Sequence, residues 1–191
     1  MKTEQLEKNS IVLVDYEEYS VLIGHEELQS EVQRIAERIT RDYKGKNPII
    51  LGIAMGGLLF WSDVCKYLEE LDFNFESDIM RFSRYSDKNE ANEKNIYMLY
   101  EPKLSLEGRY VIIVDDVYEE GITVDEARKY SIGNRAMSIE LCLACVKNKY
   151  MQRFPIKYSI LSGLSKEWLV GYGMNSGKVG RFLPFIAQKI K

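Results

Sequence analysis

The 191-residue sequence is poor in cysteine and histidine, with three cysteines and one histidine. Three cysteines are too few for a disulfide scaffold, so we expect free thiols and a cytoplasmic protein. Cys142 and Cys145 form a C-x-x-C pair, but the lone histidine, His25, is distant in sequence. This argues against a zinc site and against a Ser-His-Asp triad. We therefore expect both cysteines to be buried apolar residues.

Long hydrophobic runs and a strong charge imbalance are also absent. No apolar stretch approaches the roughly 20 residues of a membrane-spanning helix, and the first ten residues, MKTEQLEKNS, are too polar for a secretory signal. The net charge of −3 gives no general attraction to nucleic acid. We expect neither a membrane nor a nucleic-acid partner. The 46% hydrophobic and 29% charged content that is present suits a soluble domain with a real core.

Alternating strand and helix patterns predict an α/β fold with a parallel twisted sheet flanked by helices. Short apolar runs indicate buried strands, and apolar residues at helical spacing indicate helices. We expect, in chain order, a helix at 26–43, a strand at 48–54, a helix at 58–71, strands at 73–83, 96–100 and 110–114, a helix from 124, and strands at 138–147, 158–161 and 168–172.

No linker divides the chain, which predicts one main domain. Residues 1–20 are expected to form a polar N-terminal arm, and residues 21–191 a single domain with a small hood lobe near the C-terminus. The most polar stretch, SDKNEANEKN at residues 86–95, predicts a mobile loop at the tip of a long β-arm.

The most informative stretch is YVIIVDDVYEEGIT, residues 110–123. Four β-branched residues precede Asp115 and Asp116, which predicts a buried parallel strand that ends in an acidic turn. In open α/β sheets, ligands bind at the carboxyl ends of the strands. Carboxylates there suit sugar hydroxyls and hydrated Mg2+, and the N–H groups of a following helix suit a phosphate. We expect a sugar-phosphate site, with a solvated loop end as the alternative.

This stretch resembles the phosphoribosyl-pyrophosphate motif of the type I phosphoribosyltransferases. The chain further resembles their hypoxanthine-guanine phosphoribosyltransferase branch, collinearly from about Val21 to Ile186. ILGIAMGGLLFWSDV is similar to that branch's strand, pyrophosphate loop and helix. CLACVK and WLVGYGMNSGKVGRFLPFI are similar to its base-reading strand and C-terminal segment.

The resemblance implies a fold, a reaction and its partners. The implied fold is the type I phosphoribosyltransferase fold with its hood lobe. The implied reaction transfers the 5-phosphoribosyl group of phosphoribosyl pyrophosphate to a 6-oxopurine (hypoxanthine or guanine), giving IMP or GMP and pyrophosphate. Mg2+ is the implied cofactor, and a homodimer or homotetramer is the implied assembly.

The resemblance also implies roles for individual residues. Glu119 would be the catalytic acid/base. Asp115 and Asp116 would hold the ribose and, with Asn175, Mg2+ through water. The ribose and phosphate would contact Asp115, Asp116, Glu120, Gly121, Ile122 and Thr123; the pyrophosphate would contact Met55, Gly56, Gly57 and Arg181; the purine would contact Lys147, Trp168 and Leu169.

Four of these features, the Met-Gly-Gly segment and three single residues, have simpler explanations in the residues alone. Met-Gly-Gly could be a tight strand-to-helix turn. Lys147 could be a solvated lysine at a strand end, Trp168 a core tryptophan, and Arg181 a solvated arginine in a glycine-rich loop.

Four residues depart from the family pattern, and all belong to the phosphate and metal side. Glu119 stands in place of an aspartate, and a displacement of about 1 Å can cost on the order of 100-fold in rate. Glu120 replaces a threonine or serine, Met55 stands where a basic residue is frequent, and Asn175 replaces an aspartate. The positions on the purine side keep the pattern.

These departures leave two alternatives to the enzyme described above. One is a catalytically weak or inactive relative that binds a purine nucleotide in a regulatory role. The other is an enzyme for xanthine or a modified purine. We favour the active enzyme because a mobile loop that seals a site from water serves catalysis rather than binding alone.

Overall fold

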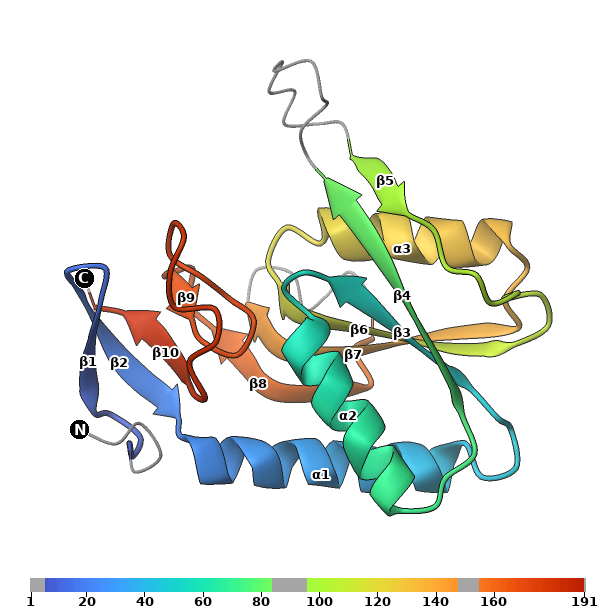
Figure 1. Ribbon diagram of the computed structural model, residues 1–191, viewed down its shortest axis with the longest axis horizontal. Helices are drawn as coiled ribbons and strands as arrows, with labels where there is room; N and C mark the ends of the chain where they lie inside the picture. Colours follow the sequence, from blue (N-terminus) through green and yellow to red (C-terminus); the bar gives the residue numbers. More distant parts are fainter. Residues whose placement is uncertain (1–5, 84–95, 148–154, 191) are drawn as a thin grey trace.

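The computed structural model describes residues 6–83, 96–147 and 155–190 (Figure 1). The loop expected at 86–95 lies outside the described residues. A six-stranded sheet in the order β5-β4-β3-β6-β7-β8 forms the centre of the molecule. Five of its strands are parallel, and β5 pairs antiparallel with β4 at one edge. The strands are β3 (Ile49–Ala54), β4 (Glu76–Ser83), β5 (Tyr97–Tyr100), β6 (Tyr110–Tyr118), β7 (Ser138–Lys147) and β8 (Tyr158–Leu164).

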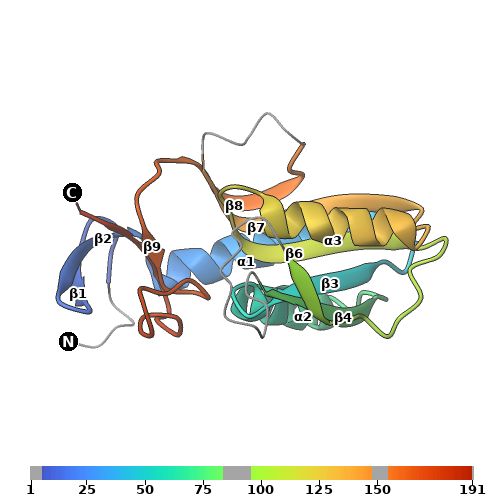
Figure 2. The ribbon, with the colours of Figure 1, turned by 90° about the horizontal axis from the view of Figure 1, so that it is seen from above.

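Helices cover both faces of this sheet, as expected. Helices α1 (His25–Asp42) and α2 (Leu58–Glu70) pack on one face, and α3 (Ile122–Gly133) lies on the other (Figures 1 and 2). Strand β3 is buried along its whole length, because both of its faces meet helices. The predicted fold class is therefore confirmed.

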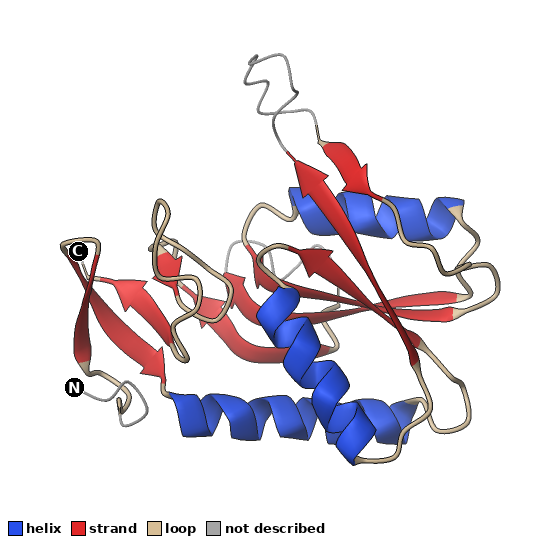
Figure 3. Ribbon diagram, viewed as in Figure 1, coloured by secondary structure: helices blue, strands red, loops and turns tan. Residues whose placement is uncertain are grey.

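A second, four-stranded antiparallel sheet forms the hood at one end of the molecule (Figure 3). Its order is β1-β2-β10-β9, which joins the two ends of the chain. The strands are β1 (Ile11–Val14), β2 (Glu17–Ile23), β9 (Leu169–Val170) and β10 (Ile186–Lys189). The sequence pattern did not predict β10.

The N-terminal residues differ from the expected polar arm. Strand β2 crosses the expected boundary between residues 20 and 21, and its hairpin with β1 belongs to the hood sheet. Alternation along β2 buries Tyr19 and Val21, which pack with Phe185 and Ala187 from the other end of the chain. This partner segment is too distant in sequence to be deduced from a local pattern.

The acidic stretch also differs in detail from the expected turn. Strand β6 continues through both aspartates to Tyr118, in parallel register with β7. The carboxylates therefore sit within the last part of a paired strand, whose neighbours hold them more rigidly than a turn would.

The cysteines follow the expectation. Cys65, Cys142 and Cys145 are free thiols, and the last two are fully buried. Burial raises the pKa of the Cys142 and Cys145 thiols, which keeps them in the unreactive thiol form. Within the described ranges, no helix has the length and apolar character needed to cross a membrane.

Candidate active site

The carboxyl ends of β3, β4 and β6 border a cavity of about 680 Å³. This is the edge of a parallel sheet where the strand order reverses, which is the usual place for a ligand. Eleven of the expected site residues line it: Gly56, Asp115, Asp116, Glu119, Glu120, Gly121, Ile122, Thr123, Trp168, Asn175 and Arg181. Residues from the helical side, the sheet and the hood thus meet at one cavity.

A smaller cavity of about 160 Å³ adjoins the first. Lys147, Leu169 and Met174 line only this smaller cavity. Five residues form a wall common to both cavities: Asp116, Val117, Glu119, Trp168 and Asn175. The two cavities are therefore compartments of one site. Of the expected residues, Met55 and Gly57 line neither compartment.

Asp115 and Asp116 place two carboxylates side by side on the floor of the larger compartment. Asp115 Oδ1 accepts the backbone N–H of Asp116 at 2.9 Å, and Asp116 Oδ1 accepts that of Val117 at 2.8 Å. Burial, and then the neighbouring Asp116 charge, hold the pKa of Asp115 well above its ordinary value. Burial likewise raises the pKa of Asp116, although the nearby Arg181 opposes that shift. The pair therefore favours a ligand that brings positive charge or hydroxyl groups.

The N-terminus of α3 faces the same compartment through Gly121, Ile122 and Thr123. Gly121 has a φ of 74°, a left-handed conformation that favours glycine. A Cβ at this position would lie 2.3 Å from the Tyr118 hydroxyl oxygen. The turn therefore needs glycine for both reasons, and it aims the first N–H groups of the helix at the cavity.

Gly56 and Gly57 form the turn between β3 and α2, and both pack tightly on β6. A Cβ on Gly56 would lie 2.2 Å from Asp116 Oδ2, and one on Gly57 would lie 2.9 Å from the Asp115 Cα. The pair is thus a tight turn, the simpler explanation, and it also brings backbone close to the acidic pair. The Ala54–Met55 peptide is cis. Met55 is 45% exposed.

Lys147 and Glu119 form an ion pair in the smaller compartment. Lys147 Nζ donates to Glu119 Oε1 at 2.7 Å and to the Lys166 carbonyl oxygen at 3.4 Å. The lysine side chain is only 6% exposed, which excludes the solvated strand-end lysine, whereas Glu119 is 45% exposed. A buried ammonium needs such a partner, because losing its hydration is costly.

The register of β6 and β7 explains this pair, which the sequence analysis did not anticipate. Tyr118, the last residue of β6, pairs with Val146 of β7. The residues that follow them, Glu119 and Lys147, therefore lie at the same edge of the sheet. The expected acid/base group and the expected purine-reading group are therefore in direct contact.

Trp168 forms the wall between the compartments and is not a core tryptophan. Its side chain is 54% exposed, and its indole Nε1 donates to the Asn175 carbonyl oxygen at 2.9 Å. The bond fixes the ring beside the cavities and leaves a flat face for a planar ligand. Leu169, the next residue, is buried in β9.

Arg181 is held inside the site rather than solvated. Its guanidinium donates to the Gly173 carbonyl oxygen and, at 2.5 Å, to Asn175 Oδ1. Arginine carries five N–H donors, so these bonds still allow it to contact an anion. The same contact engages the amide oxygen that was expected to serve Mg2+.

A hydrated Mg2+ fits the aspartate pair better than it fits Asn175. Asp115 and Asp116 offer adjacent carboxylates, the first buried and the second partly buried. Mg2+ commonly uses one or two carboxylates together with waters and substrate phosphates. Over the described ranges, no group of three or more His, Cys, Asp or Glu residues could hold a metal ion by itself. Because Asn175 Oδ1 accepts from Arg181, the arrangement argues against Asn175 as a metal ligand.

Six lining residues were not singled out from the sequence: Ile53, Ala54, Phe82, Val117, Val124 and Met174. Phe82 reaches the larger compartment from the end of β4, and Met174 reaches the smaller one from the segment after β9. The carboxyl end of β4 lies beside that of β3, so strand order could have indicated Phe82. Met174 lies within the stretch that resembles the family's C-terminal segment, but no feature of the residue itself marks it.

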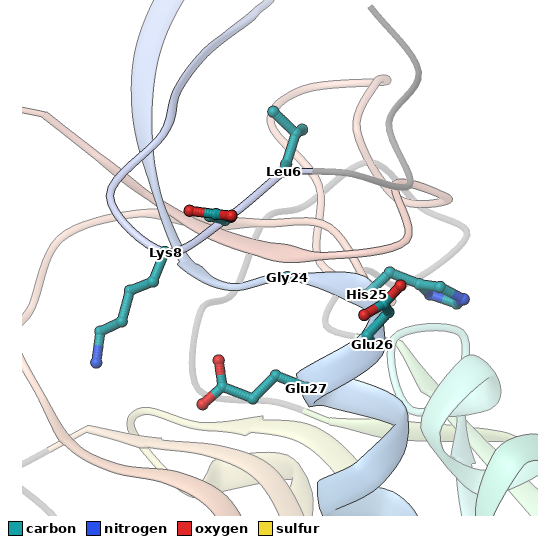
Figure 4. Close-up of a pocket in the computed structure, with 7 residues that line it drawn as sticks. Leu6, Lys8, Gly24, His25, Glu26 and Glu27 are labelled. Atoms are coloured by element: carbon teal, nitrogen blue, oxygen red, sulfur yellow. The ribbon is translucent and has the colours of Figure 1, made fainter.

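A separate cavity of about 550 Å³ lies where the hood meets the start of α1 (Figure 4). None of the expected site residues lines it. Its lining residues are Leu6, Glu7, Lys8, Gly24, His25, Glu26 and Glu27. Three glutamates there oppose any anion that the helix N-terminus would attract.

Replacing Asp116 with asparagine should stabilise the ligand-free protein at neutral pH. The change removes one of two adjacent buried charges, so we expect the melting temperature to rise by a few degrees. The gain should shrink toward about pH 4. A carboxyl whose pKa is raised by folding makes the wild-type protein less stable as the pH rises through that pKa, so the wild type recovers its stability at low pH. Thermal melts of both proteins at several pH values measure this. A lower melting temperature for the variant at pH 7 would contradict the proposed repulsion.

Comparisons with known proteins identify the family of the chain. The phosphoribosyl transferase domain family matches residues 23–176. A hypoxanthine-guanine-xanthine phosphoribosyltransferase of Tritrichomonas foetus is 27% identical over 168 residues, 87% of this chain and 88% of that protein. A hypoxanthine-guanine phosphoribosyltransferase of Streptococcus pneumoniae is 28% identical over 167 residues, 87% and 90% of the two chains. The crystal structure of a hypoxanthine phosphoribosyltransferase from Staphylococcus aureus superposes with a TM-score of 0.78 at 26% identity. The match covers 89% of this chain and 90% of that one. The chain belongs to the phosphoribosyl transferase domain family.

Proposed function

We propose that the protein transfers the 5-phosphoribosyl group of phosphoribosyl pyrophosphate to hypoxanthine or guanine, giving IMP or GMP and pyrophosphate. The observation that carries this proposal is the two-compartment site with its common wall. The larger compartment has carboxylates and helix N–H groups, which suit a ribose and its phosphate. The smaller one has a buried ammonium and an indole, which suit a purine with a 6-oxygen. A nucleotide has the same two parts joined at one bond.

In the larger compartment, the residues bind and orient the sugar and its phosphates. Asp115 and Asp116 would accept from the ribose hydroxyls, and the N–H groups at Gly121 to Thr123 would donate to the 5′-phosphate. Gly56 lets backbone approach the pyrophosphate, beside the cationic Arg181. When bound at the aspartate pair, Mg2+ would neutralise charge on the leaving pyrophosphate.

In the common wall, the acidic groups would stabilise the reaction at the ribose C1. A purine ring nitrogen forms its bond to C1 while the C1–oxygen bond to pyrophosphate breaks. Positive charge develops on the sugar, and fixed carboxylates nearby lower its energy. Glu119 would take the proton that the purine ring gives up, and Lys147 beside it would donate to the 6-oxygen.

Two features of this chain support a second function, nucleotide binding in a regulatory role. Glu119 is bound to Lys147. Met55 adds no charge to the Gly56–Gly57 turn between β3 and α2, which we call the pyrophosphate turn because it would contact that group. Both features suit a nucleotide-binding relative with little or no turnover, in a regulatory role. An enzyme for xanthine or a modified purine is a further form of the proposal.

A direct assay separates these functions. The protein is mixed with Mg2+, phosphoribosyl pyrophosphate and one of hypoxanthine, guanine, xanthine or adenine, and nucleotide formation is followed. We expect product from hypoxanthine and guanine and none from adenine, whose amino group cannot accept from Lys147, whereas product from xanthine alone would support the xanthine enzyme. IMP or GMP binding without product from any base at high protein concentration would support the regulatory relative. Omission of Mg2+ tests the proposed cofactor.

Replacing Lys147 with methionine should impair use of the purine selectively. Loss of a charged hydrogen bond to the 6-oxygen should raise KM for hypoxanthine by about 10- to 100-fold, with little change in KM for phosphoribosyl pyrophosphate. The control is Lys166→Met, because that side chain is exposed and only its backbone oxygen contacts Lys147. Steady-state kinetics with each substrate varied measures both constants. Equal effects of the two variants would remove Lys147 from base recognition.

We also propose a cytoplasmic homodimer or homotetramer. The three free thiols support a reducing compartment. The assembly is proposed from the family resemblance, and sedimentation or light scattering would test it.

A further inference from the structure

Three consecutive residues after β9 adopt positive φ angles and form a tight loop. Gly171, Tyr172 and Gly173 have φ values of 90°, 47° and 108°. A left-handed conformation is unfavourable for tyrosine, so other contacts must hold Tyr172 in place.

The side chain of Tyr172 supplies those contacts. Its hydroxyl donates to Asp63 Oδ2 on α2 at 2.6 Å, a short bond to a carboxylate. Its ring is buried, with its centroid 6.2 Å from that of Phe60. Asp63 Oδ2 also accepts from Gln29 Nε2 on α1 at 2.9 Å, which anchors the carboxylate to the second helix. The loop is thus tied to the α1–α2 layer.

The other side of the loop contacts residues of the larger compartment, the one proposed to bind the phosphates. A Cβ on Gly173 would lie 2.0 Å from the Gly56 carbonyl oxygen, so the loop rests directly on the pyrophosphate turn. The Gly173 carbonyl accepts from the Arg181 guanidinium, and the Gly173 N–H donates to the Arg181 carbonyl at 2.9 Å. The loop therefore locates both the turn and the arginine.

We propose that Asp63 and Tyr172 are positioning residues that hold the 171–173 loop against the pyrophosphate turn and thereby set the affinity for phosphoribosyl pyrophosphate. Neither residue lines the compartments described above. The bond from Tyr172 to Asp63 fixes the loop, and the loop fixes Arg181 and Gly56. This inference rests on the proposed function, because it takes phosphoribosyl pyrophosphate as the ligand.

The purine side has its own anchor, so the effect should be confined to one substrate. Leu169 and Val170 pair with β10 through Gln188 and Ala187. That pairing does not depend on the Tyr172 hydroxyl. A change in the loop should therefore alter the phosphate side much more than the base side.

The test uses Tyr172→Phe, Asp63→Ala and the double variant, because alanine, unlike asparagine, keeps no oxygen that could accept from the Tyr172 hydroxyl. Phenylalanine keeps the buried ring and removes only the hydroxyl. Each single variant should raise KM for phosphoribosyl pyrophosphate by about tenfold, with KM for hypoxanthine changed less than about twofold. The double variant should be no worse than Asp63→Ala, because each single variant already removes the bond between Tyr172 and Asp63. The matched control is Tyr158→Phe, which removes the hydroxyl of another buried tyrosine, one that donates to Asp42 Oδ2 at 2.8 Å and stands outside the chain of bonds from Gln29 through Asp63 to Tyr172.

Several outcomes would overturn the positioning role. One is an unchanged KM for phosphoribosyl pyrophosphate in both single variants. The others are an equal rise in KM for both substrates and an effect of Tyr158→Phe as large as that of Tyr172→Phe. Thermal melts of each variant separate a local effect from general unfolding. If the wild type has no turnover, the proposed reaction fails, and calorimetric titration of phosphoribosyl pyrophosphate into wild type and Tyr172→Phe then tests the positioning role alone. Equal affinities would overturn it.

Discussion

Replacing Glu119 with glutamine is expected to lower turnover by about 10²- to 10⁴-fold, the usual contribution of a general acid/base. The amide has nearly the same shape and can still accept from Lys147 Nζ, but it cannot take a proton from the purine ring. Affinity for IMP should therefore change little. Product formation measures turnover, and calorimetric titration of IMP measures affinity.

The ion pair between Glu119 and Lys147 makes the choice of control important. Glu119→Gln removes the charged partner of Lys147, whose side chain is only 6% exposed, as well as a catalytic group. Glu17→Gln also removes a carboxylate from an ion pair, but away from the site. Glu17 lies in the hood, is 42% exposed and pairs with Lys189 Nζ at 2.5 Å. We expect this control to keep wild-type turnover and nearly the wild-type unfolding free energy. Glu119→Gln should lower the unfolding free energy, because it leaves the buried Lys147 ammonium without a charged partner. Turnover of Glu119→Gln equal to wild type would remove Glu119 from the acid/base role.

Replacing Gly173 with alanine is expected to abolish detectable use of phosphoribosyl pyrophosphate. The new methyl group would lie 2.0 Å from the Gly56 carbonyl oxygen, and a backbone atom cannot move aside as a flexible side chain can. The loop must shift away from the pyrophosphate turn and take Arg181 with it. The φ of 108° adds strain for any residue with a Cβ. We expect kcat/KM to fall at least about 100-fold and the unfolding free energy to fall by about 3 kcal/mol.

Gly108→Ala is the matched control for this variant. Gly108 also has a positive φ, 70°, but no atom lies within 4 Å of the position that its Cβ would take. It should lose about 1 kcal/mol from backbone strain and keep full activity. Steady-state kinetics and urea unfolding of both variants measure these effects. Similar losses of activity in both would mean that backbone strain, rather than contact with Gly56, explains the result.

The local features of the sheet and helices could be predicted from the sequence. The stripe from Leu28 to Ile39 indicated α1, and the apolar runs indicated β3, β6 and β7, because burial on one or both faces leaves a regular pattern in the residues. The acidic motif indicated a ligand site at a strand end for the same reason. The β1–β2 hairpin and β10 escaped prediction. Strands β2 and β10 pair from opposite ends of the chain, and no local pattern indicates such a contact.

Contacts between distant segments could not be predicted from the residues alone. Resemblance suggested separate roles for Glu119 and Lys147, and only the β6–β7 register brings them within 2.7 Å. Likewise, Asn175 was expected to serve a metal, but the loop after β9 turns its amide oxygen onto Arg181. A side chain's partner depends on which surfaces the fold brings together, and this information is not local.

The sequence by itself determined the fold class and the place of the acidic pair, because hydrophobic periodicity and the end of a buried strand are properties of neighbouring residues. The tertiary structure decided how the site is divided and held. It joined two compartments through a common wall, paired Glu119 with Lys147, and tied the 171–173 loop to α2 through Tyr172 and Asp63. These arrangements depend on strand register and on packing between segments far apart in the chain, and both arise only when the whole domain has folded.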